Sequence, residues 1–180
     1  MSKLSTLDQW TRSSLALAIA VALSVGISKA ADVYLEPSEF LAQTFEADVP
    51  AAKRLWITKP IQSEIREIMG RDLGQLRVRY WPRDQRTVWI LEEIGKEQPI
   101  TTGLIVDAGK VADIRVLIYR ESRGWEVRYP AFTEQFKGAT LTDHFLLDRR
   151  IDGITGATLS VNALTRLARL ALLLHRHAVS

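Results

Sequence analysis

The sequence predicts an α+β domain in which an antiparallel sheet is flanked by helices. Segments of alternating apolar and polar residues follow one another through the middle of the chain, and short turns separate them. Helical periodicity appears before and after these segments. Consecutive strands with short links pair antiparallel, and strands bracketed by helices favour α+β over a doubly wound sheet. We therefore expect a single domain with about four or more strands.

The composition limits the chemistry. The chain has 180 residues, 47% of them hydrophobic, which is enough to bury one core. It contains no cysteine, which excludes disulfides, cysteine-ligated metal centres and a thiol nucleophile. The first thirty residues hold three of the 24 basic and one of the 21 acidic side chains, so the remainder is nearly balanced. Nucleic-acid binding needs clustered excess positive charge, so no nucleic-acid partner is expected.

Residues 1–30 resemble a targeting segment. The apolar run LALAIAVALSVGI, residues 15–27, follows Lys3 and Arg12 and precedes a Ser-Lys-Ala site that ends at Ala30. A basic start, a short apolar stretch and a small-x-small site are typical of a signal peptide. The run is shorter than the roughly 20 residues that span a bilayer. We expect a signal peptide cleaved after Ala30, with an uncleaved anchor as the alternative, and a domain in the periplasm or on the outer face of the cytoplasmic membrane.

The rest of the chain divides into residues 31–99, which hold helices and strands, and residues 100–180, which hold further strands and the C-terminal helix. One helix is expected to begin at Pro37, because proline is favoured in the first helical turn. A second runs from Thr58 to Gly70, where apolar residues keep one face and glycine ends the helix.

Four strands are expected, in residues 76–81, 87–91, 100–106 and 111–119. Apolar and polar residues alternate in the first, and β-branched and aromatic residues dominate the others. The Asp-Ala-Gly-Lys link at residues 107–110 is typical of a hairpin turn.

Two more helices follow the strands. A short helix is expected around Phe132 and Phe136 and ends at Gly138. The strongest helical periodicity covers residues 159–177. Its predicted buried stripe consists of Leu164, Leu167, Ala171 and Leu174, and the arginines expected outside the stripe are Arg166, Arg169 and Arg176.

A glycine-bearing turn runs into the start of this last helix. Residues 152–160 read Asp-Gly-Ile-Thr-Gly-Ala-Thr-Leu-Ser. Thr155, Thr158 and Ser160 offer hydroxyls, the first helical amides are free donors, and the helix dipole adds partial positive charge. The Gly-Ala pair leaves the backbone accessible. The segment therefore predicts a site for an anion such as phosphate. The alternative is that Thr155 or Thr158 only caps the helix.

This segment resembles the signature of the FMN-binding domain family, Asp-x-x-Ser/Thr-Gly-Ala-Thr-x-Ser/Thr. The family includes the C subunit of the sodium-pumping NADH:quinone oxidoreductase, the G subunit of Rnf-type complexes and small exported flavoproteins. The resemblance implies that a Mg-dependent flavin transferase joins the FMN half of FAD, through a phosphoester, to the last Thr of Ser/Thr-Gly-Ala-Thr. In this chain that residue is Thr158. The other residues that the resemblance places at the cofactor are Asp152, Thr155, Gly156, Ala157 and Leu159.

A second stretch is similar to the family's Glu-x-x-Gly loop and Phe-x-x-x-Phe-x-Gly helix, and the resemblance covers about residues 100–174. The loop residues that it implies near the flavin are Glu121, Ser122, Gly124 and Trp125. A glycine would let the backbone approach the ring, and the tryptophan would pack on or near it. Many members have Thr-Pro-Gly-Leu-Gly where this chain has Ser-Arg-Gly-Trp-Glu, so the proline and the second glycine are lost. The alternative is an ordinary exposed turn.

The resemblance implies an exported flavoprotein whose FMN-binding core lies in residues 100–180, and whose partners are a flavin transferase and redox proteins, membrane-bound ones included. We expect an electron carrier rather than a stand-alone catalyst, and we assign no catalytic or metal-binding residue. Arg123 and Arg128 are candidates for a cation near the flavin ring. One alternative is a flavin-free accessory or interaction module of a membrane redox complex. Another is a domain that binds FMN without a covalent bond.

Two further groups are interpreted structurally. His175 and His177 lie two apart on a helix, so they face different sides and are poorly placed to share a metal; we expect them to complement the helix dipole. The second group is a basic strand with Trp81, whose cations are Arg77, Arg79, Arg83 and Arg86. We interpret it as a protected sheet edge, with a docking patch for a redox partner as the alternative.

Overall fold

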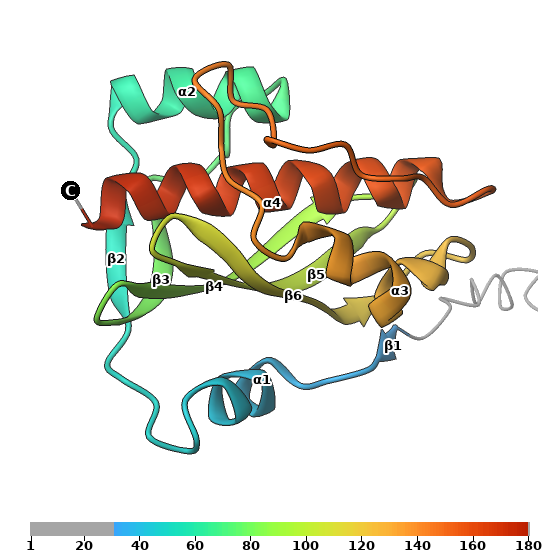
Figure 1. Cartoon of the computed structure of the whole chain (residues 1–180), viewed down its shortest axis with the longest axis horizontal. Coiled ribbons are helices and arrows are strands. Elements are labelled where there is room, and N and C mark those ends of the chain that lie inside the picture. Colours follow the sequence, from blue (N-terminus) through green and yellow to red (C-terminus); the bar gives the residue numbers. More distant parts are fainter. Residues whose placement is uncertain (1–30, 180) are drawn as a thin grey trace, which may run out of the picture.

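The computed structural model describes residues 31–179, which form a six-stranded antiparallel sheet with helices on both faces. The strand order is β1-β6-β5-β4-β3-β2 (Figure 1). The strands are β1 (Asp32–Val33), β2 (Lys53–Trp56), β3 (Arg77–Arg83), β4 (Arg86–Ile94), β5 (Pro99–Asp107) and β6 (Lys110–Tyr119). The predicted α+β class is confirmed. The predicted targeting segment, residues 1–30, lies outside the described residues.

The helices are α1 (Pro37–Thr44), α2 (Lys59–Met69), α3 (Pro130–Thr133) and α4 (Thr158–Val179), with short 3-10 turns at Trp125–Arg128 and Glu134–Phe136. Proline stands in the first turn of α1 and of α2, as predicted. Gly70 ends α2 with a φ of 68°, a left-handed conformation that glycine adopts at little cost. Helices α2 and α4 cover one face of the sheet and α1 covers part of the other (Figure 1).

Strands β3 to β6 are the four predicted strands, but β1 and β2 were not predicted. They have two and four residues, which is too short for a periodic signal. Each forms by pairing with an exposed edge of the meander: β1 pairs with β6 at Val33↔Ile118, and β2 pairs with β3 at Leu55↔Val78. Strand β3 is therefore an inner strand, and β2 is the edge.

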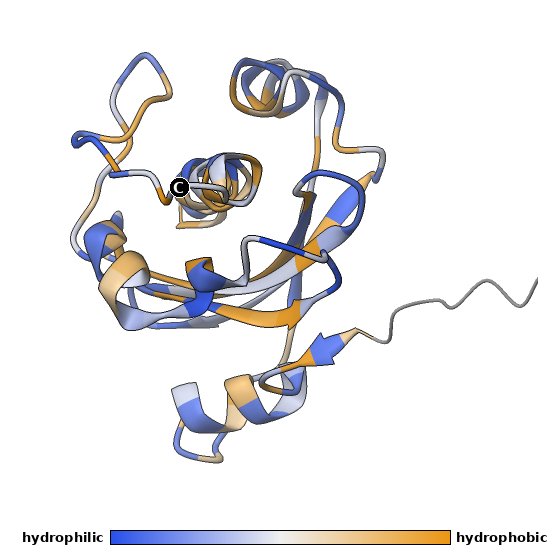
Figure 2. Ribbon diagram, turned by 90° about the vertical axis from the view of Figure 1, so that its right-hand side faces the viewer, coloured by the Kyte–Doolittle hydropathy of each residue, from blue (hydrophilic) through white to orange (hydrophobic). Residues whose placement is uncertain are grey.

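Helix α4 is buried over more of its circumference than predicted. The four residues of the predicted stripe are fully buried, but Leu172 and Leu173 are buried as well. The reason is that α4 lies between α2 and the sheet (Figure 2). Arg166 and Arg169 do not escape into solvent: both are half-buried, and they donate hydrogen bonds to the Glu93 carboxylate and to the Phe145 carbonyl, respectively.

Within residues 31–179, no helix combines the length and apolar character needed to cross a membrane.

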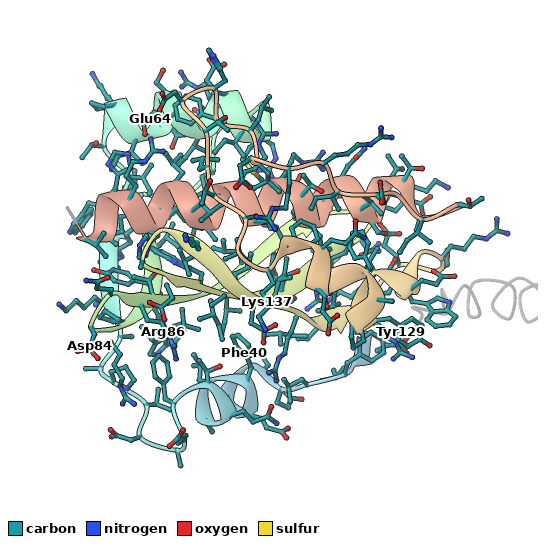
Figure 3. All side chains as sticks on the ribbon, viewed as in Figure 1. Phe40, Glu64, Asp84, Arg86, Tyr129 and Lys137 are labelled. Atoms are coloured by element: carbon teal, nitrogen blue, oxygen red, sulfur yellow. The ribbon has the colours of Figure 1, made fainter. Side chains whose placement is uncertain are left out.

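Helix α1 packs on the opposite face through Phe40, which points from the helix toward the sheet (Figure 3). Phe40 is fully buried over Gly103 of β5. A Cβ atom on Gly103 would lie 2.5 Å from the Phe40 ring. The glycine thus leaves the space that the ring fills, and this contact helps to form the smaller of the two cores.

Candidate functional site

A cavity of about 550 Å³ opens at the N-terminal end of α4. Three segments that are distant in the sequence form its wall: the turn between β4 and β5, the loop after β6, and the Gly-Ala-Thr segment that starts α4. Its lining residues are Lys96, Glu121, Ser122, Arg123, Gly156, Ala157, Thr158, Leu159 and Ser160. The structure therefore brings both predicted motifs together at one cavity.

The three hydroxyls of the motif have different surroundings. Ser160 is 4% exposed, and its Oγ lies 2.9 Å from the Tyr119 hydroxyl. Thr155 and Thr158 are exposed, and within the described residues neither side chain makes a hydrogen bond. A side-chain helix cap, the alternative for these threonines, is therefore not formed. Of the two exposed threonines, only Thr158 lines the cavity.

Backbone amides at the same place can bind an anion. The first bond of α4 runs from the Val161 N–H to the Ala157 carbonyl, at 2.9 Å. The N–H groups of Thr158, Leu159 and Ser160 precede that bond, so no intrahelical acceptor is available to them. The helix dipole adds partial positive charge at this end, and the side chains of Lys96 and Arg123 add full charges. The cavity wall is suited to a phosphate group.

Glu121 connects two of the three segments. Its Oε1 accepts hydrogen bonds from the backbone N–H groups of Lys96, Glu97 at 2.6 Å and Gln98 at 2.9 Å. The residue is only 6% exposed. Burial acts to raise the pKa of this carboxyl, but the three backbone donors outweigh it and lower the pKa, which keeps the group ionised. Glu121 thus holds the β4–β5 turn against the loop and brings Lys96 to the cavity.

Gly124 lets the loop after β6 approach α4. Its φ is 85°, and a Cβ there would lie 2.8 Å from Ser160 Oγ and 3.0 Å from Tyr119 Oη. The Tyr119 hydroxyl donates to the Arg123 carbonyl, so the Ser160 hydroxyl must donate to Tyr119 Oη. Burial raises the pKa of Tyr119, which keeps its hydroxyl protonated. The close approach observed for Gly124 is to the protein itself; contact with a flavin ring stays a prediction.

Other predicted residues lie away from the cavity lining. Trp125 packs edge-on against Tyr129 (labelled in Figure 3), and the Arg128 guanidinium lies over both rings and over Tyr34, at 4.1 Å from the Tyr34 centroid. Of the two arginines considered as cations near the ring, Arg123 lines the cavity and Arg128 does not.

Asp152 is exposed and does not line the cavity either. Its backbone N–H donates to Gln135 Oε1 at 2.7 Å, which fixes the start of the glycine-bearing turn against the segment after α3.

Lys96 was not predicted. It lies in a Gly-Lys-Glu-Gln turn that is typical of an ordinary hairpin link, and the Glu121 carboxylate binds that turn beside α4. No local sequence signal could have found it.

The histidines of α4 have separate structural roles. His175 is buried, with Nδ1 2.8 Å from Thr87 Oγ1 and Nε2 accepting the Gly109 N–H at 3.2 Å. His177 Nε2 lies 2.6 Å from Glu64 of α2 (labelled in Figure 3). His175 also lines a second cavity, of about 670 Å³, at the C-terminal end of α4. The two rings bind different elements. Burial lowers the pKa of His175 and keeps its ring neutral, so the prediction that it complements the helix dipole as a cation is wrong for this residue.

The fold and the cavity together define a small α+β domain whose last helix begins with free backbone amides beside an exposed threonine hydroxyl. The model of the FMN-binding domain family matches residues 95–173, from the turn that holds Lys96 into α4. The match over these residues confirms the predicted resemblance and supports FMN as the cofactor. No curated protein and no solved structure matches this chain.

Proposed function

We propose that this chain carries FMN through a phosphoester on Thr158 Oγ1 and serves as an exported electron carrier. The observation that carries the proposal is the Thr158 hydroxyl itself. It is exposed, it makes no hydrogen bond within the described residues, and it lies on the wall of the cavity beside the free amides of α4. The Ser160 hydroxyl is already hydrogen-bonded to Tyr119, and Thr155 does not line the cavity.

Attachment uses FAD and a flavin transferase. The Thr158 oxygen forms a bond to the phosphorus on the FMN side of FAD, the P–O–P bond breaks, AMP leaves, and the hydroxyl proton passes to a base of the transferase. The product is a phosphodiester that keeps one negative charge. The N–H groups of Leu159 and Ser160 and the Arg123 guanidinium are available to stabilise that charge. The Lys96 ammonium lies at the same cavity and also pairs with Glu97 Oε1 at 3.1 Å.

The bound flavin supplies the redox chemistry, and the protein orients it and tunes its surroundings. The same cavity that accepts the phosphate offers room beside the loop of Glu121 and Ser122. The residues present therefore fit FMN. We expect redox partner proteins to exchange electrons with it at this end of the molecule.

Export gives a reason for the covalent bond. Residues 15–27 and their flanks predict a signal peptide or anchor. A cofactor held only by reversible binding outside the cell would be lost by dilution, because occupancy depends on the concentration of free ligand. A phosphoester removes that dependence.

The test is to co-express the chain with a flavin transferase, denature it and measure its mass and absorbance. We expect wild-type protein to retain a yellow colour and a mass increase corresponding to attached FMN. Thr158→Ala should lose both. Thr58→Ala is the matched control, because that threonine is also exposed and makes no side-chain cap hydrogen bond but lies outside the signature and the cavity lining, and it should retain both.

Three results would overturn the proposal. A colourless wild-type protein would favour a flavin-free interaction module. Colour that denaturation releases completely would show reversible FMN binding. Retained flavin in Thr158→Ala with loss in Thr155→Ala would show that Thr155 is the acceptor.

A further inference from the structure

The edge strand β2 and its neighbour β3 carry an unusual arrangement of arginines on one face. Arg54 lies directly opposite Arg79, and Trp56 lies directly opposite Arg77. Their neighbours Leu55 and Val78 belong to the core beneath α2 and α4, so alternation places these four residues on the other face of the sheet. All four are exposed. We call Arg54, Trp56, Arg77 and Arg79 the β2–β3 patch.

Protection of a sheet edge does not explain this patch. The sequence interpretation treated Arg77 and Arg79 as edge residues, but β2 covers that edge, so both lie on an inner strand. Two arginines directly opposite each other across paired strands destabilise the pair. A fold that only needed to block edge pairing could do so with charges on β2 alone.

The charges of the patch are also not balanced within the protein. Among residues 31–179, no carboxylate forms an ion pair with Arg54, Arg77 or Arg79; the Arg77 guanidinium lies over the Trp56 ring at 5.6 Å. The other two arginines of the predicted basic strand differ. Arg83 pairs with Asp48 and Arg86 pairs with Asp107. Of the arginines on β3, Arg77 and Arg79 of the patch are therefore the ones without a carboxylate partner among residues 31–179.

Apolar surface lies beside these charges. Leu76 is 77% exposed and Trp56 is 60% exposed, which makes them the two most exposed large hydrophobic residues in the described part of the chain. The backbone of Leu76 is next to Trp56, because the Ile57 N–H donates to the Leu76 carbonyl directly after the Trp56↔Arg77 pair, but alternation directs the Leu76 side chain to the other face. An exposed tryptophan among arginines matches the interface of an anionic lipid bilayer, where aromatic rings sit at headgroup depth and arginines meet phosphates.

The position of the patch distinguishes an anchoring surface from a surface for electron transfer. Strand β2 lies near the C-terminal end of α4, whereas the cavity with Thr158 lies at the N-terminal end, at the opposite end of the molecule (Figure 1). A redox partner must approach the flavin and would gain nothing from docking here. We propose that the β2–β3 patch binds the anionic headgroups of a phospholipid membrane and leaves the Thr158 cavity free for partners.

The experiment is co-sedimentation of the full chain with vesicles. Vesicles of phosphatidylcholine alone are compared with equimolar phosphatidylcholine and phosphatidylglycerol, at low and high salt. We expect wild-type protein to prefer the anionic vesicles and to lose that preference at high salt. Arg54→Gln/Arg79→Gln should weaken partition roughly 30-fold, at about 1 kcal/mol for each charge near the surface. Trp56→Ala should weaken binding to the same vesicles.

The matched control is Lys110→Gln/Lys137→Gln, which removes two exposed cations outside the patch and should bind like wild type. Equal binding by wild type and the arginine double variant, or equal losses in both double variants, would overturn the proposal. Retention on polyglutamate beads without vesicle binding would also overturn it, in favour of an acidic protein partner. The arginine variant should unfold at the same or higher denaturant concentration, because it removes a repulsive pair. The assay measures partition rather than flavin, so its outcome is separate from that of the Thr158 experiment.

Discussion

The Tyr119 phenol, at the end of β6, lies 2.9 Å from the Ser160 hydroxyl in the first turn of α4. Both residues are almost fully buried. Since the phenol also donates to the Arg123 carbonyl, this one oxygen joins the loop after β6 to the helix start that carries Thr158. The geometry of the cavity therefore depends on a hydrogen bond between two residues 41 positions apart.

Tyr119→Phe should lower the free energy of unfolding by about 1–3 kcal/mol, because it leaves buried polar groups without a partner. Denaturant titration measures the loss. In a double-mutant cycle with Ser160→Ala, the two effects should be less than additive, since both variants break the same bond. Tyr129→Phe, on an exposed ring, is the control and should be near neutral. If the losses in free energy of unfolding from Tyr119→Phe and Ser160→Ala were strictly additive, the two hydroxyls would not stabilise each other.

Glu121→Gln should destabilise the protein by about 2 kcal/mol at neutral pH, because a neutral amide replaces the carboxylate that binds three backbone donors. The folded state holds the pKa of Glu121 below its ordinary value, so this stabilisation is present above that value and is lost as the pH falls through the folded one. The difference between wild type and variant should therefore shrink in acid. Glu67→Gln, on an exposed face of α2, should show no such difference. If the difference in free energy of unfolding between wild type and Glu121→Gln stayed constant with pH, the role of the Glu121 carboxylate would be contradicted.

His175 should make stability fall between about pH 7 and pH 5. Gly109 donates to Nε2, so the proton is on Nδ1 and the ring is neutral. Burial lowers the pKa of His175, although Asp107 acts to raise it. As the pH drops below the ordinary histidine value, the unfolded chain takes up a proton that the folded chain refuses, at a slope of at most about 1.4 kcal/mol per pH unit. His175→Gln should flatten the dependence and His144→Gln should not. An unchanged slope in His175→Gln would refute the explanation.

Gly103→Ala should destabilise the fold by about 1–3 kcal/mol, because the added methyl would overlap the Phe40 ring and displace α1. Combining it with Phe40→Leu should recover part of the loss, since a smaller side chain frees the space. Gly153→Ala is the control: nothing lies within 4 Å of its Cβ position, and the change should stay near neutral. Thermal or denaturant unfolding of wild type, the two single variants, the double variant and the control measures these changes. If Phe40→Leu adds its full cost to that of Gly103→Ala, the two residues do not compete for space.

The strands and helices with regular patterns could be predicted, because alternation and helical periodicity depend only on neighbours in the chain. Strands β1 and β2 could not, since each is short and forms only because β6 and β3 present an open edge. The arginines of β3 were interpreted as an edge for the same reason. Because β2 pairs with β3, Arg77 and Arg79 lie on an inner strand instead.

By itself, the sequence determined the α+β class, the turn that starts α4 and the family resemblance, because these rest on residue order and local spacing. Only the tertiary structure decided which hydroxyls remain free and which cations reach the cavity. Ser160 and Thr158 differ by two positions, but one faces the buried Tyr119 and the other faces the cavity. Lys96 lies at the same cavity because the carboxylate of Glu121, 25 residues further along the chain, accepts a hydrogen bond from its backbone N–H. Such contacts depend on how distant segments pack, and local spacing does not encode them.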